Sequence, residues 1–190
     1  MASVLAQIQK EYAEGSSEFH KHVERLEIKN GTVLLRPGQF NRRGFVVEEG
    51  CLRSYILDGN GREHTIQFAP EEWIIGDMEA ATTGEPSSLY IEAIEHSVVY
   101  FVTEHAMDGL VKASWESMVQ SRQMLINRIV AIQRRLVLQL TADAESRYIE
   151  FVKTYPQLAH RVPLKYIASY LGITPESLSR VRKQMAMKAH

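Results

Sequence analysis

Leu164 to Lys183 reads LKYIASYLGITPESLSRVRK, and this stretch decides the fold expected for the C-terminal part of the chain. Its apolar residues recur at the spacing of two short helices that cross and share one contact: Ile167, Leu171, Ile173, Leu178 and Val181. Ala168 lets the two backbones approach, and Gly172 allows a tight turn between the helices. Thr174 is suited to be the N-cap and Pro175 the first residue of the second helix. The spacing therefore predicts a helix-turn-helix.

The second of these helices carries polar residues suited to nucleic acid. In a DNA-binding helix-turn-helix, the N-terminal residues of the second helix meet base edges in the major groove. We therefore expect DNA contacts from Thr174, Glu176, Ser177, Ser179, Arg180 and Lys183. Residues 161–190 contain six basic and one acidic residue, a formal charge of +5, whereas the rest of the chain has 16 basic and 22 acidic residues. A basic segment in an otherwise acidic chain favours a role in DNA binding. The alternative is an ordinary structural helical hairpin.

Composition and motifs argue against several other classes of protein. No run of about 18 apolar residues occurs, and the first residues lack the apolar core of a secretory signal, so we expect a cytoplasmic protein without a membrane span. The single cysteine, Cys51, excludes an internal disulfide and multi-cysteine ligation of an iron–sulfur cluster. The seven histidines show no metal-ligand spacing, and no nucleophile or phosphate-loop motif occurs. We therefore predict no catalytic residue, no metal site and no enzyme activity.

After a short helical start, the N-terminal half has the sequence pattern of a β-protein. The first residues predict one short helix and then a second one that ends near Leu26. Eight β-type runs follow, separated by glycine turns: Leu26–Ile28, Thr32–Leu35, Phe45–Glu48, Leu52–Leu57, Thr65–Phe68, Trp73–Ile75, Tyr90–Ile94 and Val98–Val102. Short strands at this spacing predict an antiparallel barrel or roll.

A long helix is predicted next, over about 28 residues and thus about 42 Å. Its aliphatic residues follow a heptad pattern, which predicts a dimer interface at Met118, Leu125, Ile129, Ile132 and Leu136. A parallel two-stranded coiled coil is the favoured interpretation, and a core helix packed on its own barrel is the alternative. A further helix is expected from Ala144 to Tyr155, where Pro156 stops it.

Barrel, long helix and helix-turn-helix, in this order, resemble the bacterial cyclic AMP receptor protein and fumarate/nitrate regulator (Crp/Fnr) family of transcription regulators. The similarity is carried by glycine turns: Lys29-Asn30-Gly31-Thr32, Arg36-Pro37-Gly38, Val46 to Arg53, Asp58 to Glu63 and Ile75-Gly76-Asp77. Residues 175–180 resemble the family's recognition-helix motif, in which a glutamate and an arginine read bases, here Glu176 and Arg180.

The resemblance implies an α+β fold in three parts. A cyclic-nucleotide-binding-like antiparallel β-roll of the jelly-roll type would occupy residues 1–110 and hold the effector. A dimerisation helix would follow at 111–140 and a helix-turn-helix domain at 141–190. The implied partners are DNA, a second copy of the chain and RNA polymerase.

The segment that corresponds to the family's cyclic AMP cassette departs from the family pattern. It opens with Gly76 and Asp77, where the family has a longer acid, and closes with Ser87 and Ser88. Ser87 stands where the arginine that binds the cyclic phosphate would be, and no arginine occurs between positions 62 and 122. Without a bidentate cation the phosphate has no partner. These residues predict a degenerate effector pocket that does not bind cyclic AMP, and no cofactor is expected.

Two more departures concern DNA. Pro175 replaces the first arginine of the recognition motif, so the family's base specificity does not carry over. The residues after Lys183 are too few for the β-hairpin wing of the family, and we expect binding to rest on the helix-turn-helix and its basic flanks. The alternative function is a ligand-binding or interaction module that has no DNA target.

Overall fold

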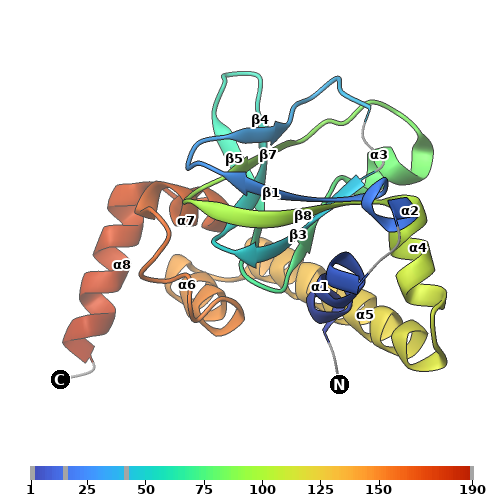
Figure 1. The fold of residues 1–190 in the computed structure, drawn as a ribbon. Coiled ribbons are helices and arrows are strands. Elements are labelled where there is room, and N and C mark those ends of the chain that lie inside the picture. The colour runs from blue at the N-terminus through green and yellow to red at the C-terminus, as the bar shows by residue number, and fades with distance from the viewer. Residues whose placement is uncertain (1–2, 15–16, 41–42, 189–190) are drawn as a thin grey trace. The chain divides into compact units, whose positions relative to one another are not determined.

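Eight antiparallel strands form two sheets in the computed structural model, which describes residues 3–14, 17–40 and 43–188. The strands are β1 (Val23–Ile28), β2 (Val33–Leu35), β3 (Arg43–Glu49), β4 (Leu52–Leu57), β5 (Glu63–Ala69), β6 (Ile74–Ile75), β7 (Tyr90–Ala93) and β8 (Ser97–Thr103). One sheet has the order β1-β8-β3-β6 and the other β2-β7-β4-β5 (Figure 1). Each strand overlaps a run expected from the sequence, and the predicted fold class is confirmed.

The helices confirm the predicted order, with one correction near the N-terminus. They are α1 (Val4–Glu14), α2 (Ser17–His20), α3 (Met78–Thr83), α4 (Glu104–Lys112), α5 (Trp115–Thr141), α6 (Ala144–Thr154), α7 (Leu164–Leu171) and α8 (Pro175–Lys188). The prediction of a second helix reaching Leu26 was wrong, because α2 ends at His20 and a strand begins at Val23. Val23 is buried and pairs with Val102 of β8, so strand pairing prevails over local helix propensity.

The chain divides into two compact units. The roll unit comprises residues 1–56 and 66–121, and the helical unit comprises residues 57–65 and 122–190. The division passes through α5, whose first turns belong to the roll unit. It also assigns the turn between β4 and β5 to the helical unit.

Two hydrophobic layers stabilise the roll unit. Side chains from both sheets meet in the first layer: Ile28, Leu35, Phe45, Val47, Leu52, Ala69, Ile75, Ile91, Ala93 and Val99. The second layer lies on the other face of the β1-β8-β3 sheet, where α1 and α4 cover it (Figure 1). Val46 and Val47 show the alternation of a strand, since Val46 packs against the helices and Val47 against the opposite sheet. Burial of each such side chain contributes about 1.5–3 kcal/mol.

The turn between β3 and β4 requires glycine. Gly50 has φ +88°, and a Cβ atom there would lie 2.4 Å from the carbonyl oxygen of His96. Any side chain would therefore displace the backbone next to β8. This close approach keeps the β3–β4 corner in place.

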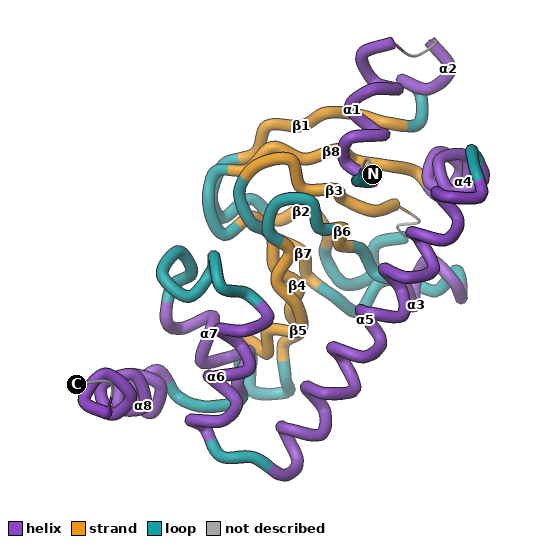
Figure 2. The backbone as a smooth tube through the Cα atoms, turned by 90° about the horizontal axis from the view of Figure 1, so that it is seen from below, coloured by secondary structure: helices purple, strands orange, loops and turns teal. Residues whose placement is uncertain are grey.

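The helical unit is built from α6, α7 and α8, which pack against one another (Figure 2). Asp143 begins α6 as its N-cap, because its carboxylate accepts the backbone N–H of Ser146 at 2.8 Å. An aromatic group joins α6 to α7, with the ring centroids of Phe151 and Tyr170 5.6 Å apart and those of Tyr155 and Tyr170 5.8 Å apart. The predicted helix over residues 144–155 is thus confirmed to within one residue.

Candidate functional site

The turn between α7 and α8 has the geometry of a tight helix-turn-helix corner. Gly172 ends α7 in the left-handed region with φ 68°, and the N–H of Ile173 donates to the carbonyl of Ala168 at 3.0 Å. A Cβ atom at Gly172 would lie 3.2 Å from Oε1 of Gln139, so the neighbouring side chain also favours glycine. The predicted role of Gly172 is therefore confirmed.

Two of the residues predicted to bind DNA bond to each other at the N-terminus of α8, where Thr174 caps the helix as predicted. The hydroxyl of Thr174 accepts the N–H of Ser177 at 3.2 Å and donates to the Ser177 hydroxyl at the same distance. Because these groups satisfy an otherwise open helix N-terminus, Thr174 and Ser177 position the helix.

The remaining predicted residues form the exposed face of α8. Leu178 and Val181 are buried on its other side. The exposed members are Glu176, Ser179, Arg180 and Lys183. A hydrogen bond from its own backbone N–H, followed by one from Thr174, lowers the pKa of Glu176, so this carboxylate is charged at neutral pH. The structure thus brings together an acid, a hydroxyl and two cations on consecutive turns of one helix.

Side chains from α5 and α6 hold the C-terminal end of α7, and the sequence analysis did not assign them this role. Arg147 Nη1 donates to the carbonyl of Leu171 and to Oε1 of Gln139, both at 2.8 Å. Gln139 Nε2 donates to the carbonyl of Tyr170 at 3.3 Å. Gln139 lies one heptad after Ile132, in register with the predicted seam, but its side chain bonds within its own chain. The signal in the sequence was that Gln139 is polar, whereas the preceding seam positions are aliphatic.

The predicted dimer positions on α5 are exposed in the single chain. They are Met118, Leu125, Ile129, Ile132 and Leu136, with exposed fractions from 42% for Leu125 to 62% for Ile129. Further apolar residues beside this seam are also exposed: Val119, Ile126, Val130, Val137 and Leu140. The apolar strip is therefore broader than the single narrow seam read from the sequence.

Residues of the predicted effector segment form hydrogen bonds with one another. Asp77 caps α3, since its Oδ1 accepts the N–H of Ala80 at 3.1 Å. Its Oδ2 accepts the hydroxyl of Ser87 at 2.7 Å, and Ser87 Oγ in turn accepts the N–H of Leu89 at 3.0 Å. Asp77 and Ser87 are both buried, whereas Ser88 is exposed. The structure thus brings two of the predicted residues into contact and leaves Ser88 outside it.

The backbone around Gly76 leaves little room. A Cβ atom there would lie 3.2 Å from the carbonyl oxygen of Arg43. Two further acids, Glu79 and Glu85, are exposed near the ends of α3. Over residues 3–14, 17–40 and 43–188, no group of three or more histidine, cysteine, aspartate or glutamate side chains could hold a metal ion.

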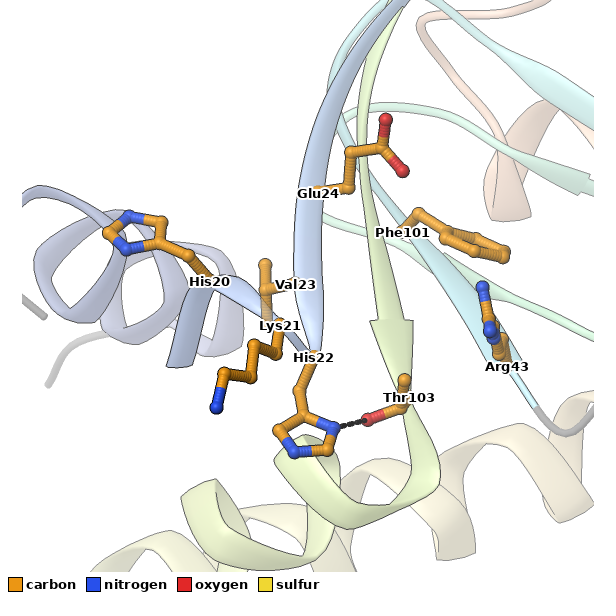
Figure 3. A pocket seen from close by; sticks show the side chains of 8 residues that line it. All are labelled: His20, Lys21, His22, Val23, Glu24, Arg43, Phe101 and Thr103. Carbon is orange, nitrogen blue, oxygen red and sulfur yellow. Dashed lines mark hydrogen bonds between the residues drawn. The ribbon is translucent and has the colours of Figure 1, made fainter. Parts of the chain in front are cut away.

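A small pocket lies at one end of β1 and β8, and none of the predicted effector residues lines it (Figure 3). It is lined by His20, Lys21, His22, Val23, Glu24, Arg43, Phe101 and Thr103. His22 Nδ1 forms a 3.3 Å hydrogen bond with the hydroxyl of Thr103, which also caps α4. The guanidinium of Arg43 lies 4.6 Å from the centre of the Phe101 ring. Both contacts join neighbouring strand ends, so they have a structural role.

Known proteins share both the fold and parts of the sequence. A model of the cyclic nucleotide-binding domain matches residues 25–114. The fumarate and nitrate reduction regulatory protein of Vibrio cholerae is 24% identical over 167 residues, which are 81% of this chain and 65% of that protein. The nitrogen fixation regulation protein FixK of Rhizobium meliloti is 27% identical over 80% of this chain and 71% of that protein. The chain thus spans less than two thirds of the length of the Vibrio relative.

Solved structures agree in fold. FixK2 from Bradyrhizobium japonicum has a TM-score of 0.73 at 19% identity, covering 88% of this chain and 86% of that chain. A CooA mutant from Carboxydothermus hydrogenoformans has a TM-score of 0.71 at 18% identity, covering 98% of this chain and 85% of that chain.

Fold and sequence together define a protein with a cyclic nucleotide-binding-type roll, a long helix and a C-terminal helix-turn-helix. The chain is similar in sequence and fold to regulators of the Crp/Fnr family. Within the described residues, no helix has the length and apolar character needed to cross a membrane.

Proposed function

We propose that this protein regulates transcription by binding a palindromic promoter site as a homodimer. The observation that carries the proposal is the exposed face of α8. Glu176 and Arg180 are four residues apart, and a buried core anchors the opposite side of the helix. The basic surroundings of this face suit a polyanion.

The chemistry of this face suggests a division of roles. The guanidinium of Arg180 can donate two hydrogen bonds to guanine O6 and N7, and the carboxylate of Glu176 can accept from a cytosine amino group. Lys183 lies one turn further on and is suited to a phosphate. Ser179 lies between Glu176 and Lys183 on the same face. Thr174 and Ser177 then contribute indirectly, because they hold the N-terminus of α8.

The apolar strip of α5 supports a second copy as the partner. A two-fold dimer places the same strip of each chain against the other, so a continuous apolar surface is complementary to itself. Covering one such aliphatic side chain is worth about 1.5–3 kcal/mol before the cost of association. The breadth of the strip indicates that the partner covers more than the single seam. In the described chain only Ser117 of α5 is buried, which argues against the alternative of a core helix.

The closed cassette supports the loss of cyclic AMP binding. A cyclic phosphate entering between Asp77 and Ser87 would meet a buried carboxylate, and the cassette itself contains no arginine. We propose that residues 1–110 respond to a different effector or to none. Residues 111–140 would hold the dimer and residues 141–190 would bind DNA. Such a regulator would act in the cytoplasm and contact RNA polymerase at its promoter.

Selection of DNA from a random library tests the function directly. The full chain should enrich a palindrome whose half-sites are about one helical turn apart. Its affinity for that site should exceed its affinity for scrambled DNA and should fall with salt. Recovery of no sequence above background would refute the proposal and favour an interaction module without a DNA target.

A further inference from the structure

The outer edge of β5 is bound by a side chain of the helix-turn-helix. β5 is an end strand of its sheet. The hydroxyl of Ser169 in α7 donates to the carbonyl of Glu63 at 2.7 Å and accepts the N–H of Thr65 at 2.9 Å. One hydroxyl thus takes the place of the donor and acceptor that a neighbouring strand would offer. Polar groups on a strand edge need such partners when they are removed from water.

A second side chain binds the same edge from α5. Arg135 Nη2 donates to the carbonyl of Thr65 and to the carbonyl of Tyr170, both at 2.9 Å. Its guanidinium carbon also lies 3.9 Å from the centre of the Tyr170 ring. Both backbone groups of Thr65 are therefore held, and Thr65 is only 1% exposed. Burial lowers the pKa of Arg135, which still leaves this arginine charged at neutral pH.

The turn that precedes this edge is itself well ordered by hydrogen bonds. The carboxylate of Asp58 accepts the N–H groups of Asn60 and Arg62 and pairs with His64 Nε2 at 2.9 Å. The hydrogen bond with His64, followed by those from Arg62 and Asn60, lowers the pKa of Asp58 to about 2. The turn therefore presents Glu63 and Thr65 to α7 in a fixed geometry.

We propose that Ser169 and Arg135 are positioning residues that clamp the turn of residues 57–65 to α7 and so orient the recognition helix. Ser169 lies three residues before Gly172, whose N–H donates to the Ser169 carbonyl at 3.2 Å. Ser169 is thus bonded directly to the turn that leads from α7 into α8. The functional part of this inference rests on the proposed DNA binding, whereas the clamp itself is independent of DNA.

Hydrogen exchange at the Thr65 amide tests the clamp in the full chain. Ser169→Ala removes both hydrogen bonds and should accelerate exchange of the Thr65 N–H by about tenfold or more, as expected for the loss of roughly 1.4 kcal/mol. Ser169→Thr keeps the hydroxyl and should restore protection. Ser146→Ala, an exposed serine of α6, is the matched control and should leave Thr65 unchanged. The amide of Val47, bonded to Trp73 in the roll unit, reports that each variant is folded. Unchanged exchange in Ser169→Ala would overturn the clamp.

DNA affinity tests the positioning role separately. Arg135→Lys keeps a positive charge but cannot bridge two carbonyl groups with a planar guanidinium. Both Ser169→Ala and Arg135→Lys should weaken binding to the selected palindrome by a factor of about three to ten and binding to scrambled DNA by less, with the salt slope unchanged. Faster exchange at Thr65 with unaltered DNA affinity would overturn the positioning role. A wild-type chain that binds no DNA would refute the proposed function, and the exchange result would still decide whether the clamp exists.

Discussion

The hydroxyl of Ser87 donates a 2.7 Å hydrogen bond to Oδ2 of Asp77, and both side chains are buried. The other carboxylate oxygen caps α3 through the N–H of Ala80. The acid that opens the cassette therefore has its partners within the chain. This arrangement links the stability of the roll unit to two residues of the predicted effector pocket.

Ser87→Ala should destabilise the protein by about 1–3 kcal/mol, because it leaves a buried carboxylate oxygen of Asp77 without its donor. The exposed neighbour provides the control, and Ser88→Ala should change stability by less than about 0.5 kcal/mol. Urea denaturation followed by tryptophan fluorescence measures both. Equal stability of the two variants would contradict this account of the cassette.

Cyclic AMP should not bind with a dissociation constant in the micromolar range or below. The reason is the missing phosphate arginine and the buried charge of Asp77. Isothermal calorimetry on the purified chain measures this. Ser87→Arg should still bind more weakly than micromolar, because the new guanidinium would pair with Asp77. Micromolar binding by the wild type would show that the cassette is functional.

Ile129→Asp should make the chain monomeric at micromolar concentration, where the proposed dimer of the wild type should persist. Ile129 is 62% exposed in the single chain, and the substitution would place two like charges in the proposed seam. Sedimentation velocity gives the oligomeric state. Gln133→Asp adds the same charge at an exposed polar position of α5 and should remain dimeric. A dimeric Ile129→Asp variant would show that the chains associate elsewhere.

Arg180→Ala should cost about 1–3 kcal/mol on the selected palindrome and relax the preference at one base pair. The loss should be much smaller on scrambled DNA, because a base contact operates only at the cognate site. Fluorescence anisotropy with both DNAs provides the comparison. Equal losses on the two DNAs would show that Arg180 binds phosphate and does not read sequence.

Lys183→Ala should weaken binding to every DNA by the same factor. If the ammonium group neutralises one phosphate, the slope of log affinity against log salt should fall by about one unit. Titrations at several salt concentrations give this slope for the wild type and the variant. A change in base preference in Lys183→Ala would assign this residue to direct reading of sequence.

Several features of the fold follow from local sequence alone. The strands were predictable because short β-type runs are separated by glycine turns. The corner at Gly172 was predictable because few residues other than glycine adopt a left-handed backbone. The exposed face of α8 followed from the spacing of Leu178 and Val181. Each of these signals acts within a few residues of the chain.

The contacts that hold and complete the candidate site come from distant segments. Ser169 meets Thr65 across 104 positions of sequence, and Arg135 meets Thr65 across 70. No local periodicity could pair them, because their partners are backbone groups whose identity is not encoded by residue type. The sequence by itself therefore determined the strands, the turn and the exposed face of α8. Only the tertiary structure decided that Ser87 satisfies Asp77 and that Ser169 closes the edge of β5. A hydrogen bond depends on where folding brings its donor and acceptor.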